Sequence, residues 1–264
     1  MEQNAFARYP RAYLSEFTTN QLHLKNPYII AFWSLLTPGL GNLLQDRKLK
    51  GLILILWGIV VNTGAKINLA VVHSLTGHFH LAKNVIDTRW LLLYLAVYVY
   101  SAWDAYRGTV DMNKLYILAD REDAPVKSFV IKALDMNFLD KRNPWLAAAW
   151  SSLMPGLGNL YLHKIITGLF FVAWTITVMY FSHGLQAIHF TMIGDFNHAK
   201  SIVDAQWLLY IPAIYRFQIY DCYVSAVEFN KLFEKEQSKW LRDHYQKIGF
   251  QMPIVSNADI DINV

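Results

Sequence analysis

A gapless internal repeat constrains this chain more than any other feature. Residues 26–115 align with residues 143–232 at a constant offset of 117, and about 34 of the 90 aligned positions are identical. The identities include prolines and polar residues: Asn26 and Pro27 recur as Asn143 and Pro144, and Asp104 recurs as Asp221. Similarity between two unrelated apolar segments would not keep such residues in register, so the sequence predicts a duplicated unit.

The composition favours a membrane protein. Apolar residues make up 54% of the chain, and charged residues make up 17%, against about 25% in an ordinary soluble domain. The single cysteine, Cys222, excludes an internal disulfide and a cysteine-based zinc site. The net charge of +4 is explained by a cytoplasmic surface that faces anionic lipid, and we expect no nucleic-acid partner.

Each unit contains three apolar stretches. They cover residues 28–44, 49–65 and 89–106 in the first unit, and 145–162, 165–182 and 206–223 in the second. A spanning helix needs about 20 mainly apolar residues, which the second and third stretches provide with their flanks. The first stretch is broken by a turn motif consisting of Pro38, Gly39 and Gly41, or Pro155, Gly156 and Gly158. It either crosses the bilayer with a kink or enters halfway and returns.

The distribution of Lys and Arg favours the returning segment. Basic residues accumulate on the cytoplasmic side of a membrane. With two returning segments, about 20 of the 24 Lys and Arg residues lie on one side, whereas six full spans give about 13 against 11. The predicted fold is therefore all-α: a polytopic helical membrane protein with two tandem repeats, each of one broken or re-entrant segment plus two transmembrane helices. Both termini are cytoplasmic, and a pseudo-twofold axis along the membrane normal relates the repeats.

These assignments divide the chain into five parts. They are a cytoplasmic N-terminal segment (1–25), membrane repeat 1 (26–115), a cytoplasmic amphipathic linker (116–142), membrane repeat 2 (143–232) and a cytoplasmic tail (233–264). In the linker, apolar residues at helical spacing predict an interfacial helix over 126–138. Residues 227–245 are predicted to form a charged helix, and 252–264 to be loose.

Two equivalent carboxylates are the first site candidates. Asp104 and Asp221 each lie about 14 residues after a tryptophan, Trp90 or Trp207, or about 21 Å along a helix. Each carboxylate would then lie in the inner third of the membrane, where an ionisable group is a functional candidate. The alternative is a structural ion pair, for which Arg107 is a candidate partner of Asp104 at i+3.

Asn42 and Asn159 are the second pair of candidates, because each follows the turn motif. An asparagine there can bind main-chain groups freed by the turn. The functional alternative is a polar contact that lines a cavity at the repeat interface.

Metal, cofactor and nucleotide sites are not predicted. Six of the nine histidines lie in or beside the outer loops, but His78, His80 and His198 are only weak metal candidates, because the histidines do not superpose between the units. The turn motif lacks the Lys-Ser/Thr pair of a phosphate-binding loop, and no motif for a catalytic nucleophile is present.

The turn motif carries a family resemblance. The run Trp-Ser-x-Leu-x-Pro-Gly-Leu-Gly-Asn-Leu begins at Trp33 and again at Trp150, and it resembles a motif of the two-transmembrane domain family of bacterial membrane proteins. The usual aromatic residue after the turn is Tyr161 here, but Leu44 in the first unit. The resemblance implies an integral protein of the bacterial cytoplasmic membrane, without an assigned activity.

Three functions remain open. The first is a non-enzymatic membrane scaffold or assembly factor that holds other membrane proteins or cytoplasmic partners through 116–142 and 228–250. The second is a small transporter or channel with a site at the interface of the repeats, where Asp104 and Asp221 couple or select ions. The third is a membrane enzyme that uses outer histidines and a metal. The absence of a catalytic constellation favours the scaffold.

Overall fold

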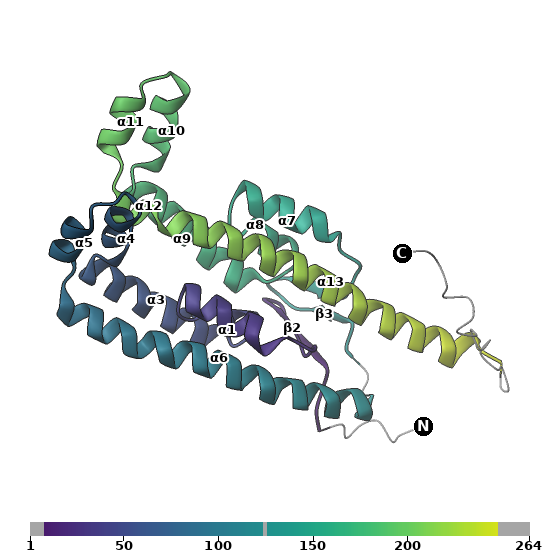
Figure 1. The fold of residues 1–264 in the computed structure, drawn as a ribbon. Coiled ribbons are helices and arrows are strands. Elements are labelled where there is room, and N and C mark those ends of the chain that lie inside the picture. The colour runs from purple at the N-terminus through teal and green to yellow at the C-terminus, as the bar shows by residue number, and fades with distance from the viewer. Residues whose placement is uncertain (1–7, 124–125, 248–264) are drawn as a thin grey trace, which may run out of the picture.

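The computed structural model describes residues 8–123 and 126–247, and it is mostly helical (Figure 1). This confirms the all-α class, apart from two short β-hairpins. The first unit comprises β1 (Ala12–Leu14), β2 (Thr19–Gln21), α1 (Pro27–Leu36), α2 (Leu40–Leu44), α3 (Lys48–Ala65), α4 (Ile67–Leu75), α5 (Phe79–Val85) and α6 (Thr88–Glu122).

The second unit follows the same order of elements. It comprises β3 (Phe129–Ile131), β4 (Met136–Phe138), α7 (Pro144–Leu153), α8 (Leu157–Tyr161), α9 (Ile165–Phe181), α10 (Gly184–Met192), α11 (Phe196–Ile202), α12 (Ala205–Leu208) and α13 (Tyr210–Tyr245). Most bounds equal those of the first unit plus 117. The exceptions are α9, which ends one residue early, and the long last helix, which is interrupted at Leu209. Pro212 explains the break, because proline lacks an N–H and its ring clashes with the carbonyl four residues earlier.

Local sterics explain how the apolar segment breaks, and we call residues 26–45 and 143–162 the two elbows. Asn26 caps α1 with its side chain and Pro27 occupies the first turn. Thr37 is extended before Pro38. Gly39 follows with φ +94°, and a Cβ there would lie 2.4 Å from the carbonyl oxygen of Gly51. Only glycine fits this turn, and Gly156 repeats it with φ +100°.

Each elbow returns to the end of the bundle from which it started. The Lys25 ammonium donates to the Leu44 carbonyl, which joins the two ends of the first elbow. In the second elbow, the Asn143 N–H donates to the Tyr161 hydroxyl over 3.2 Å. The tip is held against the middle of α6, where the Gly39 N–H donates to Ser101 Oγ at 2.9 Å. The two ends of each elbow therefore lie close together, with the glycine turn between them.

The helix predicted over 126–138 is wrong. This segment forms the antiparallel hairpin β3–β4, and an equivalent hairpin, β1–β2, lies 117 residues earlier. Val130 and Ile131 are β-branched and favour a strand. Asn137 is buried and donates to the main-chain carbonyl of Ser15, so the two hairpins pack together. We call this end of the bundle the hairpin end. The helix over 227–245 is confirmed within α13, and 252–264 lie outside the described residues.

Length and composition single out few spanning helices. Among the described residues, α3 is the one helix long and apolar enough to cross a bilayer, and up to three crossings result if each bent helix pair counts as one span. The bent pairs are α5 with α6, at 90°, and α9 with α10, at 64°. In the second unit, α9 has only 17 residues and α12 is separated from α13 at Leu209, so neither forms one long apolar helix like α3.

The two units contact each other through different faces. In the first unit, Trp33 of α1 packs on Phe217 and Tyr220 of α13, with ring centroids 5.4 and 5.1 Å apart. A symmetric contact would join Trp150 of the second unit to Tyr100 and Trp103 of the first unit. These three side chains are exposed instead. Figure 1 shows α6 and α7 at opposite edges of the molecule. The expected pseudo-twofold relation is therefore wrong for these contacts, which run head to tail.

Candidate functional site

The first elbow holds Asp104 in an open ion cluster. Asn42 Nδ2 donates to Asp104 Oδ2 at 2.8 Å, Arg47 Nη1 lies 3.2 Å from the same oxygen, and Lys50 Nζ lies 2.6 Å from Oδ1. These partners come from α2, from the start of α3 and from the residue before it. The predicted partner of Asp104 is wrong, because Arg107 pairs instead with Asp111 at 3.3 Å.

The second elbow holds Asp221 in a closed, buried cluster. Lys164 Nζ lies 3.4 Å from Asp221 Oδ1 and donates to Ser225 Oγ at 2.7 Å. The Lys164 and Asp221 side chains are 6% and 5% exposed, whereas those of Lys50 and Asp104 are 31% and 13% exposed. Lys164 is equivalent to Arg47 at the offset of 117. The main cation of the second cluster therefore has a cationic equivalent in the first cluster.

The two asparagines connect the elbows to the long helices. Asn42 binds Asp104, and Asn159 donates to Gln218 Oε1. Both side chains therefore bind α6 or α13 rather than the main chain of the turn. Within the described residues, the Oδ1 atoms of Asn42 and Asn159 are buried without a hydrogen-bond partner. The structure thus places all four polar candidates at the elbows, each pair in its own unit.

A small cavity lies between the units, beside the second cluster. It has a volume of about 120 Å³ and is lined on one side by His23, Lys25 and Asn26 and on the other by Asp221 and Glu228. Burial, reinforced by the charge of Lys25, lowers the pKa of His23 to about 3. Burial also lowers the pKa of Lys25. Neither residue belongs to a motif, so sequence reasoning does not identify them.

The outer histidines do not converge. His78 Nδ1 lies 3.0 Å from Thr76 Oγ1, His80 Nδ1 lies 3.2 Å from Asn84 Nδ2, and His198 packs against Phe190 at 4.1 Å. In residues 8–123 and 126–247, no three His, Cys, Asp or Glu side chains lie close enough to hold a metal ion.

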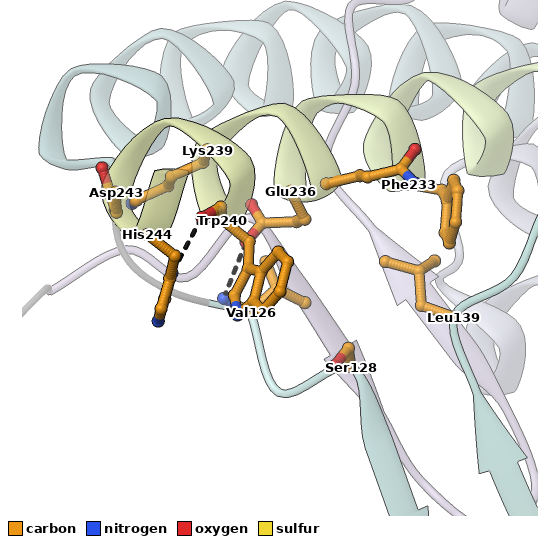
Figure 2. A pocket seen from close by; sticks show the side chains of 10 residues that line it. Val126, Ser128, Leu139, Phe233, Glu236, Lys239, Trp240, Asp243 and His244 are labelled. Atoms are coloured by element: carbon orange, nitrogen blue, oxygen red, sulfur yellow. Dashed lines mark hydrogen bonds between the residues drawn. The ribbon is translucent and has the colours of Figure 1, made fainter. Parts of the chain in front are cut away.

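A groove at the hairpin end joins two segments that are far apart in sequence. It has a volume of about 450 Å³ and runs between α13 and hairpin β3–β4 (Figure 2). Phe233 and Trp240 extend from α13, and Val126, Ser128 and Leu139 lie beneath them (Figure 2). The Val126 N–H donates to Glu236 Oε2 at 3.5 Å. The groove is apolar in its base and carries charged side chains along α13.

A buried arginine braces this end of the molecule. Arg11 precedes β1 and is 2% exposed. Its guanidinium lies 2.6 Å from Asp123, at the end of α6, and 3.3 Å from Glu236 of α13. Lys239 also pairs with Asp123, at 2.9 Å. Arg11 therefore links the ends of both long helices and positions Glu236 in the groove. Sequence reasoning misses Arg11, because its partners lie more than 100 residues away.

Comparisons of the chain with protein-family models, curated proteins and solved structures found no match. The resemblance to the two-transmembrane domain family rests on the turn motif, and it stays a prediction.

Proposed function

We propose that the chain is a multi-pass protein of the bacterial cytoplasmic membrane, built from two tandem membrane repeats. In each repeat the elbow re-enters and two helices cross, with both termini on the cytoplasmic side. Support comes from the return of both elbows to the hairpin end, and from apolar side chains exposed along α3 and α6, such as Ile53, Leu56, Leu92 and Leu95. Lipid is the natural environment for such a surface.

Cysteine accessibility tests this topology. Leu49 lies at the start of α3, near the hairpin end, and Thr76 follows α4 at the opposite end. In a Cys222→Ala background, we expect Thr76→Cys to react with a membrane-impermeant maleimide in intact cells. Leu49→Cys and Val126→Cys should react only after permeabilisation. Labelling of Leu49→Cys from outside would contradict the re-entrant elbow.

We further propose that the protein is a non-enzymatic scaffold or assembly factor that binds a partner at the cytoplasmic groove. The proposal rests on the contact between parts of the segments 116–142 and 228–250 in one groove, which residues 126–139 and 233–244 line (Figure 2). The sequence pattern indicates these two segments separately as partner-binding candidates. Trp240 is 51% exposed beside a half-buried Phe233–Leu139 base. Exposed aromatic side chains above an apolar pocket are typical anchors of protein interfaces.

Paired substitutions on α13 test the scaffold function. Trp240→Ala removes the groove anchor, and we expect it to weaken recovery of a co-purifying partner at least tenfold, because an anchor contributes about 2 kcal/mol or more. Leu241→Ala is the matched control: it removes an apolar side chain of the same helix that is 46% exposed and does not line the groove. Equal recovery with both variants would argue against the groove as the binding site.

A transporter is the second candidate, supported by the cavity between the units and the buried Lys164–Asp221 pair. Ionisable groups in a membrane protein mark ion pathways by default. Under this hypothesis, Asp104→Asn combined with Asp221→Asn abolishes flux into proteoliposomes, whereas Asp111→Asn, at an exposed ion pair, leaves it intact. Unchanged flux in the double variant would eliminate this candidate.

A further inference from the structure

The contact between the units provides a template for a second contact. The first unit contributes what we call an acceptor face, which includes Trp33, Thr63 and Asn68. The second unit contributes a donor face, which includes Gln206, Tyr210 and Tyr220. Trp33 packs on Tyr220, Thr63 Oγ1 lies 3.4 Å from the Tyr210 hydroxyl, and Asn68 Nδ2 donates to the Gln206 carbonyl at 2.9 Å.

The second unit has its own acceptor face, and nothing in the described part of the chain fills it. The equivalents of Trp33, Thr63 and Asn68 are Trp150, Tyr180 and Leu185, which are 42%, 75% and 66% exposed. Tyr180 and Leu185 also line a largely apolar groove of about 360 Å³, together with Leu153, Met154, Thr175, Ile176, Met179 and Tyr215. In the first unit, the corresponding groove is occupied by the donor face of the second unit.

The first unit has an open donor face as well. Tyr210 and Tyr220 correspond to Leu93 and Trp103, which are 53% and 61% exposed on α6. The open donor and acceptor faces lie at opposite edges of the molecule, along α6 and beside α7 (Figure 1). Within the described residues, both faces therefore lack the kind of neighbour that their counterparts have.

We propose that a second copy of this chain fills the open acceptor groove with its α6 donor face. The template contact is heterologous, and repeating it links copies head to tail, in a ring if the rotation closes. Both hairpins lie at one end of the bundle, so the repeated displacement keeps every copy in the same membrane orientation. This inference rests on the proposed membrane embedding, and it goes beyond the scaffold function.

The side chains are complementary in size at the central position. Within the chain, the small Thr63 receives the large Tyr210; between copies, the large Tyr180 receives the smaller Leu93. The polar pair of Asn68 with Gln206 becomes Leu185 with Arg89, so the hydrogen bond is lost there. Polar contacts add to packing as a source of helix association in lipid. We therefore expect the contact between copies to be weaker than the contact between units.

Cross-linking between copies tests the proposal. The background is Cys222→Ala, because the equivalent residue of the first unit, Ala105, is already an alanine. One copy carries Tyr180→Cys, and a second, tagged copy carries Leu93→Cys. With a short bis-maleimide in native membranes, we expect a dimer at least five times more abundant than with Leu95→Cys in place of Leu93→Cys. Leu95 is exposed at nearly the same depth but faces about 200° away on the helix.

An internal control shows that the template and the fold are intact. Thr63→Cys with Tyr210→Cys in one chain should give an internal cross-link through the same geometry. If this link forms and the Tyr180–Leu93 dimer does not, the proposal is wrong. Equal dimer yields with Leu93→Cys and Leu95→Cys would also overturn it, because random collision would then explain them.

A photoreactive amino acid at position 180 distinguishes the possible occupants. An adduct at twice the chain mass of 30.5 kDa supports a second copy. An adduct of another mass, or only lipid adducts, overturns the proposal. In each of these cases, extraction from membranes is tested separately. If only detergent extracts the chain, the proposed membrane embedding holds whatever the occupant of the groove.

Discussion

The two elbows share a backbone but differ in their electrostatics. In the first, Asp104 binds Asn42 and two cations at a partly exposed position; in the second, Asp221 binds Lys164 and Ser225 at a buried one. A buried charge that loses its partner is costly, whereas an exposed ion pair contributes little. The turn therefore fixes where a carboxylate meets the elbow, and burial decides how much the stability of the fold depends on that carboxylate.

Removal of the buried cation should have the largest effect on the free energy of unfolding. Lys164→Met leaves Asp221 without its cation, and we expect the free energy of unfolding in mixed micelles to fall by about 3–5 kcal/mol. Lys50→Met leaves Asp104 with Arg47 and Asn42, and should cost less than about 1 kcal/mol. Similar losses for the two variants would show that burial does not distinguish the clusters.

The elbows themselves should respond alike. Gly39→Ala and Gly156→Ala both place a Cβ 2.4 Å from a main-chain oxygen at positive φ. We expect each variant to lose at least about 2 kcal/mol of unfolding free energy, because the left-handed conformation alone costs about 1–2 kcal/mol. Gly77→Ala is the control, since its φ is +81° but its Cβ meets nothing within 4 Å. If it destabilises as much, the close approach is not the cause.

A smaller, matched effect is expected at the start of each elbow. Asn113 accepts from the Lys25 N–H and donates to the Lys25 carbonyl, and Asn230 does the same with Arg142. Each alanine substitution removes two hydrogen bonds and should cost about 2 kcal/mol. Thermal unfolding of the two variants in the same detergent measures the difference. A gap above about 1 kcal/mol would show that these contacts are not equivalent.

The smallest effect is a pH dependence that arises from His23, which faces Glu228 of the second unit at 3.5 Å. The pKa of His23 is lowered to about 3 in the folded chain, against about 6.5 when unfolded. Below pH 6.5 the unfolded chain takes up a proton that the folded chain does not, so stability is lost as the pH falls. Between pH 6.5 and 5.0 the loss should be about 1.5 kcal/mol. His23→Gln should remove this slope, and an unchanged slope would assign it to another group.

Local sequence determined the helices, the elbow turns and the correspondence between units. The pair Pro38-Gly39 breaks the helix through local sterics, and the offset of 117 alone aligns it with Pro155 and Gly156. The hairpins escape sequence reasoning because their ten positions share one identity, Asn20 with Asn137. Apolar spacing over 126–138 fits a helix, and the packing of Asn137 against β1–β2 adds to the strand preference of Val130 and Ile131.

Residues within one or two turns of each other specify two similar, mainly helical units with a glycine turn in each, so these features can be predicted from the sequence. Long-range packing specifies which cation meets each carboxylate, that Arg11 links the ends of both long helices, and that the units pack through different faces. Those contacts join residues separated by more than 50 positions, and their geometry is set by the packing of whole helices.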